Sequence, residues 1–130
     1  MKKKIMIVDD ETDIQAYLMA ALEDIGYSTC TVNDINDILG SIYQEKPDLI
    51  ILDIMMPDRS GISIYREIQQ NPEFKTIPII LMSGLSSKNE FIEKLFHDKN
   101  DSDKISGSTI FIEKPIQLET LEKQISNLLE

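Results

Sequence analysis

Five polar residues that can bind metal ions or phosphate stand directly after short apolar runs, or within two residues of one, in this 130-residue chain. They are Asp9, Asp10, Asp53, Ser83 and Lys114. Three carboxylates held close together repel one another, so all three stay ionised only beside a counter-cation. If the fold gathers these residues, they form an anionic pocket with one ammonium and one hydroxyl group.

Such a pocket suits phosphoryl chemistry assisted by Mg²⁺. This ion prefers carboxylate and carbonyl oxygens, and it commonly takes part of its octahedron from phosphate. The ammonium of Lys114 and the hydroxyl of Ser83 could each bind a phosphoryl oxygen. Asp53 is the expected nucleophile, because attack of a carboxylate on phosphorus gives an acyl phosphate while the two cations neutralise the charge on the transferring oxygens.

Five short segments have the composition of strands and could position these residues. Four are continuous apolar runs, typical of strands that are buried on both faces of a sheet. They cover 5–8, 49–52, 79–82 and 110–112. The fifth segment, 27–32, carries Ser28, Thr29 and Thr31 and therefore suits the edge of the sheet.

Segments with apolar residues at helical spacing lie between these runs. They cover 14–25, 35–42, 62–68 and 118–128, with a weaker pattern over 91–96. Gly26 is placed to end the first helix, Asp34 can cap the second and Ser60 can cap the third.

The alternation of strands and helices predicts an α/β fold with one doubly wound sheet of five parallel strands and helices on both faces. The carboxyl ends of parallel strands lie at one edge of such a sheet, and ligands bind beyond that edge. All five polar residues follow strands, so we expect them to converge there.

The motifs around these residues resemble the receiver domains of two-component response regulators, the CheY-like class, over almost the whole chain. The motifs are the acidic pair in Ile7-Val8-Asp9-Asp10-Glu11, the run Leu52-Asp53-Ile54-Met55-Met56-Pro57, Gly61, Ser83-Gly84 and Lys114-Pro115. Each motif is weak alone, but their order and placement together are specific. The resemblance implies a flavodoxin-like sheet with strand order 2-1-3-4-5. It also implies a cis peptide bond between Lys114 and Pro115.

The resemblance further implies a metal site. Asp10, with the backbone carbonyl of Met55, would bind Mg²⁺ directly, and Asp53 would belong to the same set. Asp9 would bind the ion mainly through water. These four residues are the expected metal-binding set.

For phosphoryl transfer, the resemblance makes Asp53 the phosphorylated aspartate and places Ser83 and Lys114 against the phosphoryl group. Ser83 and Phe111 would then be the switch residues that rearrange. The donor would be a sensor histidine kinase or a histidine phosphotransfer protein, and a downstream protein would recognise the switched state. On this expectation the chain is a phosphorelay switch and not an enzyme, since it catalyses only its own phosphorylation and slow dephosphorylation.

Composition opposes other classes of protein. The net charge of −10 opposes binding to nucleic acid by this chain alone. No apolar run approaches the roughly 20 residues of a membrane span, and no secretory signal is readable, so a cytoplasmic location is the default.

Residues 1–130 would form one receiver domain without an output domain. The single cysteine, Cys30, is expected to be structural, and the single histidine, His97, to be solvated.

Several of these residues could instead serve the fold alone. Asp9 and Asp10 could cap a helix, Lys114 could be an ordinary loop residue, and Phe111 could be a core side chain.

Two further functions compete with the phosphorylation switch: a pseudo-receiver that docks a partner without phosphate, and a Mg²⁺-dependent phosphohydrolase. Phosphohydrolases of this kind typically carry a second acid two residues after the nucleophile, where this chain has Met55.

The stretch between Ser83 and Lys114 is longer than is usual for receivers. Residues 98–108 replace the expected turn with a polar segment, which we expect to be a surface loop. Receivers commonly engage partners near this region, so partner surfaces cannot be assigned by analogy. The pair Ser83-Gly84 replaces the commoner Thr-Ala or Ser-Ala, and its glycine gives the loop more backbone freedom.

Overall fold

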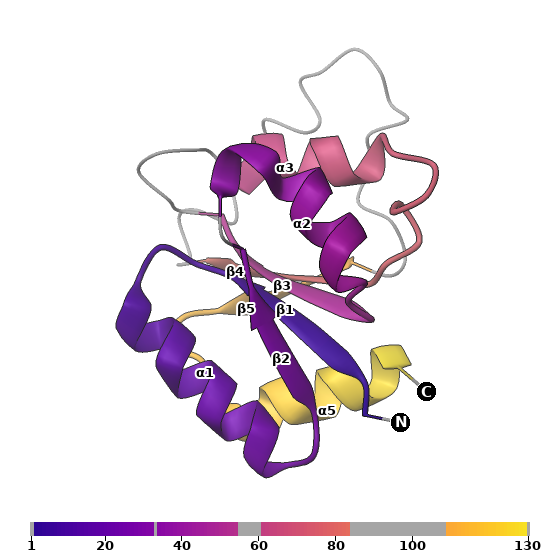
Figure 1. Cartoon of the computed structure of the whole chain (residues 1–130). Helices are drawn as coiled ribbons and strands as arrows, with labels where there is room; N and C mark the ends of the chain where they lie inside the picture. Colours follow the sequence, from indigo (N-terminus) through magenta and orange to yellow (C-terminus); the bar gives the residue numbers. More distant parts are fainter. Residues whose placement is uncertain (1, 33, 55–60, 84–108, 130) are drawn as a thin grey trace.

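The computed structural model describes residues 2–32, 34–54, 61–83 and 109–129, and in these ranges strands and helices alternate as expected (Figure 1). In chain order the elements are β1 (Lys4–Val8), α1 (Thr12–Asp24), β2 (Ser28–Thr31), the 3₁₀ turn η1 (Ile35–Asp37), α2 (Ile38–Glu45), β3 (Leu49–Asp53), α3 (Gly61–Gln69), β4 (Ile79–Ser83), β5 (Thr109–Glu113) and α5 (Leu118–Leu129). Each apolar run of the sequence lies within a strand.

The five strands form one parallel sheet in the order β2-β1-β3-β4-β5. This is the order implied by the family resemblance, and it puts β2 at an edge, as its Ser and Thr residues predicted. The register aligns the carboxyl ends of the strands: Val8 pairs with Leu52, and Asp53 pairs with Met82. Residues that follow β1, β3, β4 and β5 therefore start from the same edge of the sheet.

Helices cover both faces of the sheet, α2 and α3 on one face and α1 and α5 on the other (Figure 1). Alternate strand residues point to opposite faces, and the two apolar layers follow that period. Met6, Val8, Ile50 and Leu52 pack in the layer under α2 and α3, while Ile5, Ile7, Leu49 and Ile51 pack in the layer under α1 and α5. Burial on both faces is why these strands read as unbroken apolar runs.

Gly26 ends α1, as predicted. Its φ of 107° lies in the left-handed region that glycine adopts without strain. Its amide donates to the carbonyl of Glu23 at 3.1 Å, and the amide of Tyr27 donates to that of Leu22 at 3.0 Å. These two bonds satisfy carbonyls that the end of the helix leaves without partners.

The second helical segment differs from the prediction of one helix capped by Asp34. Asp34 instead caps the turn η1, where its side chain accepts a hydrogen bond from the amide of Asn36 at 3.0 Å. Asp37 is the N-cap of a separate helix, α2, and its carboxylate accepts a hydrogen bond from the amide of Gly40 at 3.3 Å. Two capping aspartates three residues apart divide the segment into a 3₁₀ turn and a helix.

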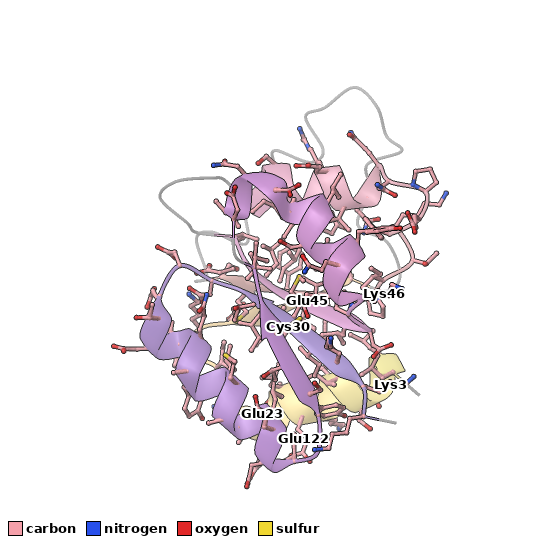
Figure 2. All side chains as sticks on the ribbon, in the orientation of Figure 1. Lys3, Glu23, Cys30, Glu45, Lys46 and Glu122 are labelled. Carbon is pink, nitrogen blue, oxygen red and sulfur yellow. The ribbon has the colours of Figure 1, made fainter. Side chains whose placement is uncertain are left out.

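Cys30 lies partly buried in β2 and has the character of a structural thiol (Figure 2). Burial, reinforced by the negative charge of Glu45 and opposed by Lys4, raises the pKa of its thiol to about 11. The thiol therefore stays protonated and unreactive at neutral pH.

Several predictions fall on residues outside the described ranges. They are the cap at Ser60, the weak helix over 91–96, the solvated His97 and the polar loop 98–108. Among the helices of the described part of the chain, none combines the length and the apolar character needed to cross a membrane.

Candidate functional site

Three carboxylates converge at the carboxyl edge of the sheet. Asp9 and Asp10 follow β1, and Asp53 is the last residue of the neighbouring strand β3. One carboxylate oxygen from each lies within 4.8 Å of the others. Asp9 is 4% exposed and Asp53 is 0% exposed, whereas Asp10 is exposed to solvent. The predicted convergence of these acids is confirmed.

Lys114, which follows the edge strand β5, completes this cluster. Its Nζ donates a hydrogen bond to Oδ2 of Asp53 at 3.0 Å. Its backbone amide donates to the carbonyl of Ser83 at 2.8 Å, which ties the segment after β5 to the end of β4. The peptide bond from Lys114 to Pro115 is cis, as the family resemblance implied. Lys114 is therefore not an ordinary loop residue.

The charges of the cluster are not balanced among the described residues. Burial raises the pKa of Asp9 to about 6; the amide of Glu11 and the charge of Lys114 oppose this rise, whereas the charges of Asp53 and Glu11 add to it. Burial alone would lower the pKa of Lys114, but its hydrogen bond and ion pair with Asp53 outweigh burial and raise it. One ammonium thus faces three acids, and a further cation would relieve their repulsion.

Two buried polar atoms at this edge lack a hydrogen-bond partner in the described structure: Oδ2 of Asp9 and Oγ of Ser83. Ser83 is only 1% exposed. A buried polar group without a partner costs about 1–3 kcal/mol. Three neighbouring carboxylates, one with an open oxygen, are the donors that a hard divalent cation prefers, and the Ser83 hydroxyl suits a phosphoryl oxygen. These residues fit a site for both groups.

Helix capping explains only part of the acidic pair. Oδ1 of Asp9 accepts a hydrogen bond from the amide of Glu11 at 2.8 Å, which fixes the turn before α1. The N-cap residue of α1 is Glu11, and its side chain makes no capping bond. The capping role therefore accounts for one oxygen of Asp9 and leaves its other oxygen open to a ligand.

Sequence reasoning missed Gln15, whose side-chain amide donates to the backbone carbonyl of Asp9. In the sequence Gln15 is a polar residue of an amphipathic helix, next to apolar Ile14. No signal in that pattern distinguishes it from a solvated helix residue.

Gly61 approaches the site from the first position of α3. A Cβ atom at this position would lie 2.3 Å from Cα of Ile54 and 2.8 Å from the carbonyl oxygen of Asp53. Only glycine allows the two backbones to approach so closely. The sequence pointed to Gly61 through the family resemblance alone.

Phe111 lies on β5, partly buried against the layer under α2 and α3. Nearby in that layer, the hydroxyl of Tyr65 and Oγ1 of Thr109 are hydrogen-bonded at 3.0 Å. This position of Phe111 suits both a core residue and a switch residue. Met55, the remaining member of the expected metal-binding set, lies outside the described residues.

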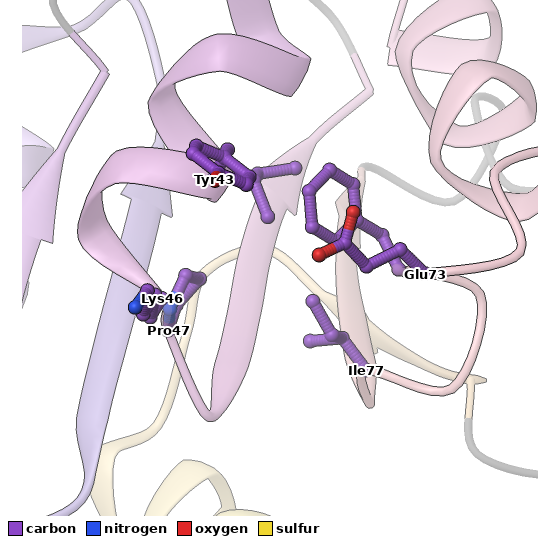
Figure 3. Close-up of a pocket in the computed structure, with 7 residues that line it drawn as sticks. Tyr43, Lys46, Pro47, Glu73 and Ile77 are labelled. Carbon is purple, nitrogen blue, oxygen red and sulfur yellow. The ribbon is translucent and has the colours of Figure 1, made fainter.

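A separate hollow of about 360 Å³ lies at the opposite end of the sheet, between the end of α2 and the segment before β4 (Figure 3). Its lining combines Tyr43, Phe74 and Ile77 with the charged residues Lys46 and Glu73. It contains neither a cluster of acids nor the Lys114–Asp53 pair. The five polar residues that the sequence analysis singled out therefore lie at the carboxyl edge, not around this hollow.

Comparison with known proteins agrees with this geometry. A family model described as the response regulator receiver domain matches residues 5–126. The protein named "Probable transcriptional regulator ycf27" of Guillardia theta is 34% identical over 128 residues, which are 98% of this chain and 46% of that protein. This chain thus spans less than half the length of that relative.

Solved structures show the same fold. The signal receiver domain of a signal transduction histidine kinase from Syntrophus aciditrophicus is 29% identical with a TM-score of 0.80, covering 98% of this chain and 89% of that one. The chemotaxis response regulator CheY4 of Vibrio cholerae is 26% identical with a TM-score of 0.78, covering 99% of this chain and 100% of that one.

Proposed function

The chain belongs to the response regulator receiver domain family, and we propose that it is a phosphoacceptor whose Asp53 takes a phosphoryl group from a protein phosphohistidine. Receiver domains are signalling switches of two-component systems. The donor would be a sensor histidine kinase or a histidine phosphotransfer protein, which implies a cytoplasmic location.

One observation carries this proposal. Asp53 ends β3 within 4.8 Å of Asp9 and Asp10, and it is paired with Lys114 at 3.0 Å. A buried carboxylate needs a nearby positive charge, such as that of Lys114, if it is to stay ionised. An ionised carboxylate is the form that can attack phosphorus.

In the proposed reaction a carboxylate oxygen of Asp53 attacks the phosphorus of the phosphohistidine. An O–P bond forms, the N–P bond breaks, and the histidine nitrogen of the donor leaves with the electron pair. Lys114 would move its hydrogen bond from Asp53 to a phosphoryl oxygen, and Ser83 would donate its hydroxyl to another. Positioning and charge neutralisation supply most of the catalysis in such transfers.

Asp10 and Asp53, with Asp9 through water and the carbonyl of Met55, would hold Mg²⁺, which neutralises charge on the phosphoryl oxygens when bound. The oxygen donors and the open Oδ2 of Asp9 support this assignment.

Output would follow from a change of surface. Once Asp53 is phosphorylated, Ser83 would shift toward the phosphoryl group and Phe111 would repack beside it. A downstream protein that binds this second state more tightly shifts the population toward it. The net charge of −10 on the 130-residue chain makes its direct binding to nucleic acid unfavourable.

The proposal is tested by incubating the protein with Mg²⁺ and acetyl phosphate and measuring its intact mass. We expect one phosphoryl adduct on the wild type, and none when EDTA replaces Mg²⁺. Lack of an adduct under both conditions, with saturable Mg²⁺ binding retained, would refute phosphoacceptor function. That result would indicate a pseudo-receiver instead.

A further inference from the structure

The side chain of Gln15, the fourth residue of α1, connects this helix to the backbone of the acidic turn. Its Nε2 donates a hydrogen bond to the carbonyl oxygen of Asp9, six residues earlier. Its own amide donates to the carbonyl of Glu11 at 3.0 Å. Gln15 therefore holds the turn from Asp9 to Glu11 at both ends.

The bond to Asp9 restrains Asp10 as well. The carbonyl of Asp9 and the amide nitrogen of Asp10 belong to one planar peptide unit. Fixing the oxygen limits rotation about ψ of Asp9 and φ of Asp10, the two soft dihedral angles beside that unit. Because Oδ1 of Asp9 is also fixed by the amide of Glu11 at 2.8 Å, the backbone from which both acids project has little freedom.

This restraint opposes the repulsion within the cluster. Oxygens of Asp9, Asp10 and Asp53 lie within 4.8 Å of one another, and without a cation they repel. Asp9 and Asp53 are buried, but Asp10 is exposed and could swing into solvent if its backbone turned. A held turn keeps the carboxylate of Asp10 directed toward the other two.

We infer that Gln15 is a positioning residue for the divalent cation, acting through the backbone between Asp9 and Asp10 without touching the ion. The inference rests on the proposed function, since it requires that the acid cluster binds a cation. Mg²⁺ demands near-ideal octahedral geometry, whereas Ca²⁺ accepts flexible geometry. Loss of the Gln15 bond should therefore weaken Mg²⁺ binding more than Ca²⁺ binding.

The test uses Gln15→Met, which removes the donor, keeps the length of the side chain and retains good helix propensity. Gln44→Met is the matched control, because Gln44 is an exposed residue of α2. Dissociation constants for Mg²⁺ and Ca²⁺ are measured by isothermal titration calorimetry on the full chain. Unfolding in urea with EDTA is measured in parallel.

Gln15→Met should weaken Mg²⁺ binding about tenfold, the lower end of the effect of outer-shell partners on metal affinity. Its Ca²⁺ affinity should change by about threefold or less, given the tolerance of that ion. Gln44→Met should change neither constant, and both variants should unfold at similar urea concentrations. If Gln15→Met does not fold, Gln15→Ala is measured with the same expectation.

Two results would overturn the inference while the proposed function survives: unchanged Mg²⁺ affinity in the Gln15 variant, or equal losses of Mg²⁺ and Ca²⁺ affinity, which indicate general loosening of the turn. Failure of the wild type to bind Mg²⁺ saturably is a different outcome. It would refute the metal site itself, and the inference with it.

Discussion

Lys114→Met removes the ammonium that faces Asp53 but keeps most of the length of the side chain. The carboxylate of Asp53 is 0% exposed, so its charge loses a partner 3.0 Å away without gaining water. Breaking a fully buried ion pair costs about 3–5 kcal/mol. The Lys114 side chain is 25% exposed, and solvent screens part of its charge, so we expect the free energy of unfolding to fall by about 2–3 kcal/mol.

Urea denaturation at pH 7 in EDTA, followed by far-UV circular dichroism, measures this loss. The same substitution in an Asp53→Asn background should cost less than about 1 kcal/mol, because the buried carboxylate that is hydrogen-bonded to the ammonium is then absent. Lys4→Met is a matched control. Lys4 pairs with Glu45 at 3.3 Å, with side chains 34% and 33% exposed, and such a surface pair is worth about 0–1 kcal/mol.

Two outcomes would refute charge compensation of Asp53 by Lys114. An equal loss in the wild-type and Asp53→Asn backgrounds would show that Lys114 contributes packing and not charge compensation. A loss no larger than that of Lys4→Met would show that the pair at the carboxyl edge is as weak as one on the surface.

Other substitutions at the site have effects of different sign. In EDTA, Asp9→Asn should raise the free energy of unfolding at pH 7 by up to about 3 kcal/mol. The reason is that burial, as the largest cause, raises the pKa of Asp9 from 3.8 to about 6, so the charged carboxylate destabilises the folded wild type at pH 7. The protonated carboxyl of Asp9 is uncharged, so the wild type has its full stability at low pH and loses about this amount as pH rises through about 6. Urea titrations at pH 4 should therefore show almost no difference in stability between Asp9→Asn and the wild type. A variant that is no more stable than the wild type at pH 7 would contradict the effect of burial. Gly61→Ala should lower stability by about 1–3 kcal/mol, since its Cβ would lie 2.3 Å from Cα of Ile54; a thermal melt like that of the wild type would show that the backbone yields freely. Ser83→Ala should leave stability unchanged or raise it by up to about 1 kcal/mol, because Oγ of Ser83 is buried without a partner in the described structure. The same variant should take up phosphoryl from acetyl phosphate about tenfold more slowly or worse, and wild-type kinetics by intact mass would exclude a role for the hydroxyl.

The strands could be predicted because burial on both faces of a parallel sheet demands unbroken apolar runs. The runs at 5–8 and 49–52 became β1 and β3 with one more residue each. The division of the segment 35–42 was not readable, because Asp34 and Asp37 are both good caps and the choice between one helix and two elements depends on local hydrogen bonds. The strand order came from the family resemblance and not from periodicity.

The cluster of Asp9, Asp53 and Lys114 could be predicted because each follows a strand, and parallel strands end at one edge. The contribution of Gln15 could not, since it depends on a side chain reaching back to a backbone carbonyl across a turn. The hydrogen bond between Tyr65 and Thr109 joins residues 44 positions apart, and only the packing of α3 on the sheet brings them together.

In the proposed reaction the carboxylate of Asp53 itself forms the acyl phosphate. Borohydride reduces an aspartyl phosphate to homoserine, so reductive trapping after incubation with Mg²⁺ and acetyl phosphate, followed by peptide mass spectrometry, identifies the modified residue. We predict homoserine at position 53 and its loss in samples treated with EDTA. Homoserine at position 9 or 10 instead, or at no position in protein that carries the adduct, would contradict phosphorylation of Asp53.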